Sequence, residues 1–276
     1  MPVNANDKLT VTGLRSFLIK MFSIPYRFAI AIGLLESFKP IQKFASMVAA
    51  SSGTTYDVAV MGDEIYGHPT GTFEATSSDN ADTEDLVIEG LSATGVFQQT
   101  TVTLTGQTVV PVPGTWSIIF RAFNNSGTAL VGDVYISKDT ATYVAGVPQE
   151  PALVAAKIAI GSEQTEQSMF RVPLGYYAYI ENVCYSIGST TGSITPLGTF
   201  RLRRRDSGKI FRTVKTDHVR IDHKDPGPNY LFPPLCDLKV DVTPRQNNTL
   251  IAVTYDIQLI PEAIVKLTNL LQPTVV

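Results

Sequence analysis

Short runs in which apolar and polar residues alternate recur from Asp85 to Ile260, and a turn follows each of them. The clearest runs are 101–104, 116–120, 133–136, 237–242 and 254–259. Successive side chains of a strand point to opposite faces, so each run predicts a strand with one buried face. Many short strands separated by turn residues are typical of an antiparallel β-sandwich or barrel.

The two ends of the chain follow another pattern. Between Leu14 and Ala50 strict alternation stops, and apolar residues fall near helical spacing, at Leu34, Phe38, Ile41, Phe44, Ala45 and Val48. After Pro261 the spacing of Ile264, Leu267, Leu270 and Leu271 predicts a short helix. We therefore expect a helical or extended N-terminal docking arm at 1–55, a β-sandwich body at 56–260 and a C-terminal helix or tail at 261–276.

Composition agrees with a β-rich chain that assembles. Of the 276 residues 17% are charged, against roughly 25% in an average soluble domain. Charge is depleted from the centres of interfaces, which favours an assembling subunit over a monomeric sandwich with a Thr-rich face. A net charge of −3 argues against a general nucleic-acid binder, which normally has a basic surface.

The segment 17–35 is strongly apolar, but Lys20, Pro25 and Arg27 interrupt it. A membrane span needs about 20 apolar residues with few charges, and a signal peptide would place its apolar region nearer Met1. A buried or interface segment is the favoured interpretation, with an amphipathic helix on a membrane surface as the alternative. The candidate docking side chains of this arm are Phe17, Phe22, Phe28, Leu34 and Leu35.

Signals of catalysis are weak. His218 and His223 flank two aspartates, but their spacing matches no metal-ligand motif, and a solvated loop explains them better. Phosphate-binding glycine loops and the nucleophile elbow are absent from the sequence. A paired-carboxylate site of the glycosidase kind among Asp82, Glu84, Asp85 and Glu89 is a remote alternative. We expect no enzymatic activity, no cofactor and no metal.

The two cysteines, Cys184 and Cys236, lie in apolar strand contexts. They are too few for a tetrahedral zinc site, and no histidine stands at zinc-finger spacing. Buried free thiols are the expected state, and a disulfide between them stays open.

Two clusters are candidates for contact with other molecules. Arg201, Arg203 and Arg205 share one face of a predicted strand, either as a docking stripe for an acidic neighbouring subunit or as a solvated outer face. Tyr177 and Tyr179 share one face of another strand. They are candidate ligand-facing aromatics for sugar rings, although packing in a core or an interface is commoner for tyrosine.

Seven segments together resemble a family of virion structural proteins of tailed phages, especially marine ones. They are 88–91, 101–108, 116–122, 132–136, 167–176, 200–204 and 231–238. The resemblance covers about residues 56–260 and rests on the order and spacing of turn-and-strand signatures. It implies a jelly-roll-like β-sandwich that takes its place in a phage particle, and it transfers no catalytic residue.

We therefore predict a structural subunit of a tailed-phage virion, made in the host cytoplasm. A head-associated position, as capsid, cement or decoration protein, is favoured over the tail. Its partners would be other virion proteins and copies of itself, with a trimer favoured, without specific nucleic acid or a membrane span. The number of predicted strands leaves a double jelly roll open. A carbohydrate-binding module of a tail or fibre is the competing prediction.

Overall fold

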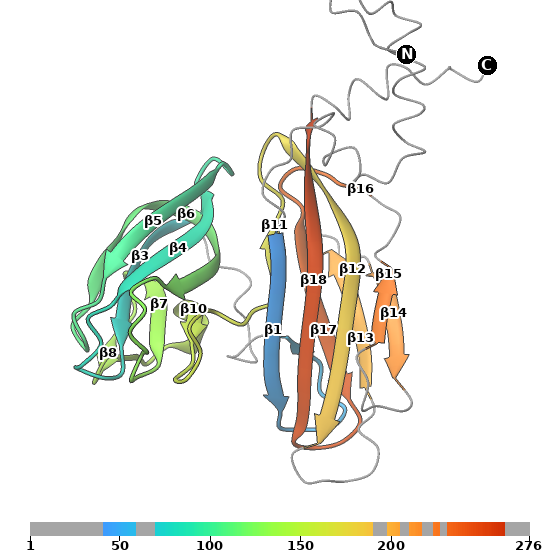
Figure 1. The fold of residues 1–276 in the computed structure, drawn as a ribbon, viewed down its shortest axis with the longest axis horizontal. Helices are drawn as coiled ribbons and strands as arrows, with labels where there is room; N and C mark the ends of the chain where they lie inside the picture. Colours follow the sequence, from blue (N-terminus) through green and yellow to red (C-terminus); the bar gives the residue numbers. More distant parts are fainter. Residues whose placement is uncertain are drawn as a thin grey trace, which may run out of the picture.

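A computed structural model describes residues 41–58, 70–189, 198–204, 210–216, 223–226 and 231–262. These residues are mainly β, with one short 3-10 helix at Pro151–Leu153. Neighbouring strands pair antiparallel in each sheet, as the alternating pattern predicts. The described strands form two lobes, which we call the sandwich lobe and the inserted lobe (Figure 1).

The inserted lobe is a six-stranded sheet that rolls into a half-barrel. Its strand order is β10-β7-β3-β6-β4-β5. The strands are β3 (Gly71–Ser77), β4 (Asp85–Ser92), β5 (Phe97–Thr103), β6 (Val110–Asn124), β7 (Val134–Lys138) and β10 (Val154–Ile158). A small hairpin of β8 (Tyr143–Val144) and β9 (Val147–Pro148) lies beside them. The sheet rolls because β6 pairs with β3 along its first half and with β4 along its second half.

The sandwich lobe is built from chain segments on both sides of the inserted lobe. Its front sheet contains β1 (Ile41–Ala49), β18 (Thr249–Pro261) and β12 (Tyr176–Ser189), with β15 (His223–Pro226) and β16 (Leu231–Phe232) along β12. Its rear sheet contains β17 (Asp237–Pro244), β13 (Gly198–Arg204) and β14 (Ile210–Thr216), with β2 (Tyr56–Asp57) and β11 (Phe170–Arg171) along β17. The inserted lobe therefore interrupts the sandwich between β2 and β11.

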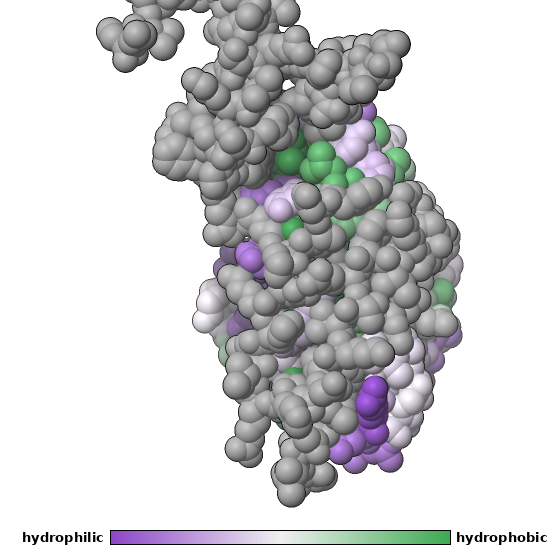
Figure 2. All heavy atoms as spheres, turned by 90° about the vertical axis from the view of Figure 1, so that its right-hand side faces the viewer, coloured by the Kyte–Doolittle hydropathy of each residue, from purple (hydrophilic) through white to green (hydrophobic). Residues whose placement is uncertain are grey.

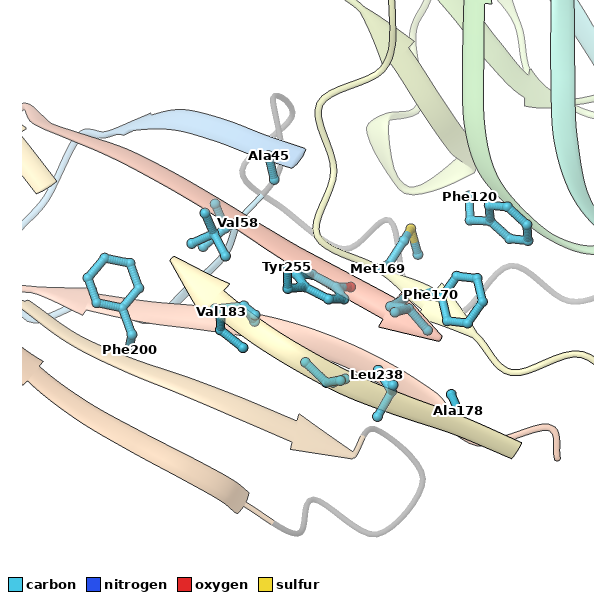
Figure 3. Close-up of a cluster of buried hydrophobic side chains, with 14 of the residues drawn as sticks. Ala45, Val58, Phe120, Met169, Phe170, Ala178, Val183, Phe200, Leu238 and Tyr255 are labelled. Carbon is cyan, nitrogen blue, oxygen red and sulfur yellow. The ribbon is translucent and has the colours of Figure 1, made fainter. Parts of the chain in front are cut away.

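The core of the sandwich lobe lies between its two sheets (Figure 3). On β12 the buried residues are Ala178 and Ile180 and then Val183 and Tyr185. The change from even to odd numbers coincides with an irregularity in the pairing of β12 with β18 between Ile180 and Asn182. A bulge adds one residue to a strand, so it keeps both halves of β12 facing the core.

The helical N-terminal segment that we predicted is not supported where the structure describes it. Residues Ile41–Ala49 form β1, which pairs with β18 along its full length. Ala45, Met47 and Ala49 alternate into the core, and this period of two decides the structure once a partner strand is present. Residues 1–40 and 263–276 lie outside the described residues, so the division into arm, body and tail stays a prediction.

Strand β6 joins the two lobes because it is buried on both faces from Trp116 to Phe120. Trp116 and Ile119 belong to the core of the inserted lobe, whereas Ile118 and Phe120 belong to the core of the sandwich lobe. The Phe120 ring lies 5.2 Å from the ring of Phe170, centroid to centroid (Figure 3). The lobes are thus fixed to each other by a strand that serves two cores.

Candidate assembly surface

The outward face of the front sheet combines four cross-strand rows from β1, β18 and β12, and we call it the front face. The rows are Gln42–Asp256–Asn182, Phe44–Thr254–Cys184, Ser46–Ala252–Ser186 and Val48–Leu250–Gly188. These residues alternate along each strand with the buried core residues, so their side chains point away from the core.

Charge is sparse in these four rows, and the strand register places one lysine, Lys224 of β15, opposite Cys184 at their edge. Among its described side chains Asp256 alone is charged, and its carboxylate accepts hydrogen bonds from Gln42 Nε2 at 3.1 Å and Asn182 Nδ2 at 3.5 Å. The carboxylate of Glu166 reaches the edge of the face at β1, where it accepts a hydrogen bond from Ser46. A sheet face that meets water normally carries polar and charged residues, and lysines often protect an edge strand such as β1. The front face combines neutral polar and apolar side chains, and depletion of charge of this kind is typical of the centre of a subunit interface.

The front face is also flat at the end farthest from Asp256. Val48 is 53% exposed and Leu250 44% exposed, and they stand opposite each other on β1 and β18. Gly188 is the third member of this row, and a Cβ atom there would lie 3.6 Å from the Cβ of Leu250. A row of two branched aliphatic residues and a glycine gives an apolar surface without protruding polar groups.

Tyr177 and Tyr179 extend the outward side of β12 beyond the four rows. Both are half-buried, whereas Ala178 between them is buried in the core. In the strand register Tyr177 stands opposite Ile260 and Tyr179 opposite Gln258. The two tyrosines therefore share one side of the strand, and contact with a sugar or a subunit stays a prediction for them.

The arginine cluster lies at the rear sheet, on the other side of the sandwich lobe. The register of β13 and β17 places Arg201 opposite Asp241 and Arg203 opposite Lys239. Position 201 thus has an acidic cross-strand neighbour within its own sheet. Arg205 and the predicted docking side chains of the arm lie outside the described residues: Phe17, Phe22, Phe28, Leu34 and Leu35. The docking role of the cluster and of the arm stays a prediction.

Lys43 on β1 is a buried lysine at the contact between the lobes. It points inward, is 3% exposed, and donates a hydrogen bond to the carbonyl oxygen of Phe120 on β6. Burial lowers the pKa of its ammonium group to about 7, with repulsion by Arg121 acting in the same direction and Glu89 partly offsetting both. The Lys43 side chain links the two lobes through its hydrogen bond, but its protonated form costs free energy because the charge is buried.

Asp82, one of the four acidic residues considered for a glycosidase site, has a structural role, and the glycosidase alternative stays untested. The Asp82 carboxylate is buried and accepts hydrogen bonds from the backbone N–H groups of Val131 and Gly132 at 2.7 and 3.0 Å, which anchors a loop. In the described part of the chain no group of three or more His, Cys, Asp or Glu residues is arranged to hold a metal ion. The helices found in that part include none that is long and apolar enough to cross a membrane.

Both cysteines are free thiols. Cys236 is buried, as we expected, but Cys184 is only half-buried and stands on the front face. The thiol of Cys184 therefore reports on whether the front face is covered.

Comparisons with known proteins give only remote matches. No protein-family model and no curated protein matches the chain. Among solved structures, the chain is similar to a VP2 subviral particle of infectious bursal disease virus, at 9% identity and a TM-score of 0.20, over 87% of this chain and 78% of that one. The Gx strain of that virus gives 9% identity and a TM-score of 0.21, over 82% and 73%. Structural similarity at TM-scores this low gives no basis for assigning a fold or a function to this chain.

Proposed function

We propose that the chain is a non-enzymatic structural subunit of a viral particle, which binds further copies of itself through the front face. The observation that carries this proposal is the scarcity of charge in the four rows of the front face, in contrast to the exposed polar residues and the Lys157–Asp133 ion pair of the inserted lobe. The resemblance of residues 56–260 to virion structural proteins supports a tailed-phage particle. Within it we propose a jelly-roll-like sandwich at the head, in a trimer or another closed homo-oligomer.

The size of the front face predicts how tightly copies associate. A strand of 9 residues is about 30 Å long and three strands span about 14 Å, which gives a footprint of about 400 Å² per subunit. A stable interface buries about 800 Å² on each partner. The front face alone therefore supports weak, concentration-dependent association, and a closed particle gains stability by repeating the contact.

The test places a charge in the centre of the front face. In Ala252→Glu a carboxylate enters the row between Ser46 and Ser186. Because association would desolvate that charge, the concentration at which half of the protein is associated should rise at least tenfold. The matched control is Thr101→Glu on an exposed position of β5 in the inserted lobe. Sedimentation equilibrium over a range of concentrations measures both.

The proposal holds if wild type and Thr101→Glu associate alike and Ala252→Glu is monomeric. It fails if all three chains have the same mass at every concentration. A stable monomer in all cases, together with selective glycan binding that Tyr177→Ala abolishes, would favour the carbohydrate-binding module instead.

A further inference from the structure

A second apolar surface lies at one end of the sandwich lobe, where three turns meet. Val96 comes from the β4–β5 hairpin, Leu174 from the β11–β12 turn and Leu235 from the β16–β17 connection. They are 52%, 47% and 49% exposed. We call this surface the apolar end. Figure 2, which views the sandwich lobe from the side away from the inserted lobe, shows hydrophobic described atoms gathered toward its upper end.

Gly95 holds the three turns together. Its carbonyl oxygen accepts a hydrogen bond from the N–H of Leu174 at 2.8 Å, and its φ of 81° lies in the left-handed region. A Cβ atom at Gly95 would lie 2.4 Å from Cδ2 of Leu235 and 3.6 Å from Cβ of Leu174. Both leucine side chains therefore lie against this glycine, and Val96 follows it directly in the chain.

Leu235 adds an independent sign that this surface is covered. Its φ is 61°, a backbone conformation that glycine or asparagine adopts far more readily than a branched side chain. The side chain of Leu235 is nevertheless 49% exposed, so packing against the described residues offsets little of the cost of this backbone conformation. A contact residue whose partner lies outside the described residues would show this combination.

We propose that the C-terminal segment 263–271 of the same chain covers the apolar end. The backbone N–H of Glu262 donates a hydrogen bond to the carbonyl oxygen of Gly175 at 2.7 Å, so the chain leaves β18 one residue from Leu174. The segment carries one charge, Lys266, and five aliphatic side chains: Ile264, Val265, Leu267, Leu270 and Leu271. Nine residues reach at most about 30 Å, which is ample for a surface that begins beside the exit point.

This occupant differs from the one proposed for the front face. The apolar end needs a short apolar segment tethered next to it, because a tether raises the effective concentration of the segment without a second copy. Two distinct apolar surfaces thus have two distinct partners, one within the chain and one between chains. The inference does not depend on the proposed function.

The direct test is a photo-cross-link from Val96. A benzoylphenylalanine at this position, in the full chain, is irradiated in a mixture of isotope-labelled and unlabelled protein, and the cross-linked peptides are identified by mass spectrometry. We expect cross-links to residues 263–276 of the same chain. The control is the same photoreactive residue at Val144 of the inserted lobe, which is 63% exposed and should give none. Cross-links to 1–40, cross-links between labelled and unlabelled chains, or none at Val96 would overturn the proposal.

A truncation gives a second readout. A chain that ends at Glu262 should bind severalfold more of a dye for exposed apolar surface, while its circular dichroism stays that of a β protein. Leu174→Ser with Leu235→Ser in the truncated chain should remove the increase. Unchanged dye binding on truncation contradicts the proposal. Because Ala252→Glu changes the mass and not the dye binding at the apolar end, failure here is distinct from failure of the front face.

Discussion

The two lobes share an antiparallel architecture but turn different chemistry toward solvent. On the inserted lobe Lys157 pairs with Asp133 at 2.7 Å, both partly exposed, and β5 exposes Gln99 and Thr101. On the front face of the sandwich lobe Asp256 is the one charge among the described side chains. The antiparallel architecture alone therefore does not predict which lobe assembles. The prediction rests on the chemistry of the residues that point outward.

The largest effect should come from breaking the strand that joins the lobes. Phe120→Ala removes a side chain that is 2% exposed and packs on Phe170, so it should lower the free energy of unfolding by about 3–5 kcal/mol. Calorimetry should also show two transitions where wild type has one, because the lobes lose part of their shared core. A single transition with an unchanged midpoint would mean that Phe120 does not couple them.

Lys43 should give the inter-lobe contact a pH dependence. Its pKa is about 7 in the folded chain, against 10.5 for an ordinary solvated lysine, so between these values the unfolded chain binds more protons. Stability from this group should therefore rise with pH above about 7, by at most about 1.4 kcal/mol per pH unit. Denaturant unfolding of wild type and Lys43→Met between pH 6 and about 9.5 should show the rise in wild type alone.

The upper limit of that range has a physical reason. Burial and Asp133 raise the pKa of Tyr135 to about 12, and burial raises the pKa of Tyr255 well above its ordinary value, so their ionisation opposes folding at higher pH. Equal pH profiles for wild type and Lys43→Met would show that Lys43 is solvated in the folded chain.

The smallest effect on stability should come from the rear sheet. Arg203 stands opposite Lys239, so Arg203→Glu replaces a like-charge neighbour with an opposite one and should change the free energy of unfolding by no more than about 0.5 kcal/mol. If the arginine cluster docks an acidic subunit, the same substitution should weaken association and remove its dependence on salt. Association that is unchanged by Arg203→Glu would contradict the docking role of the arginine cluster.

The alternating pattern predicted the antiparallel strands well but could not predict the two lobes. The alternation from Trp116 to Phe120 predicts a strand with one buried face. The run carries no charge, however, and such a run also fits a strand that is buried on both faces. The second core comes from residues far along the chain. In β12 the bulge after Ile180 changes which residues face inward, and only the pairing with β18 reveals it.

The candidate site was predictable only in part, for the same reason. The shared side of Tyr177 and Tyr179 follows from their spacing within one strand. The front face does not, since Gln42 and Asp256, which meet in one of its rows, lie 214 residues apart in sequence. The prediction of helix over 41–48 was wrong because the apolar spacing of so short a segment fits a helix or a strand, and the pairing of β1 with β18 decides for the strand.

The most direct test of the central claim uses Cys184, which stands in the front face, with the buried Cys236 as internal reference. The rates at which iodoacetamide alkylates the two thiols are measured at protein concentrations below and above the association midpoint. We predict that alkylation of Cys184 slows at least tenfold on association while that of Cys236 stays slow throughout. Equal rates for Cys184 in monomer and oligomer would contradict assembly through the front face.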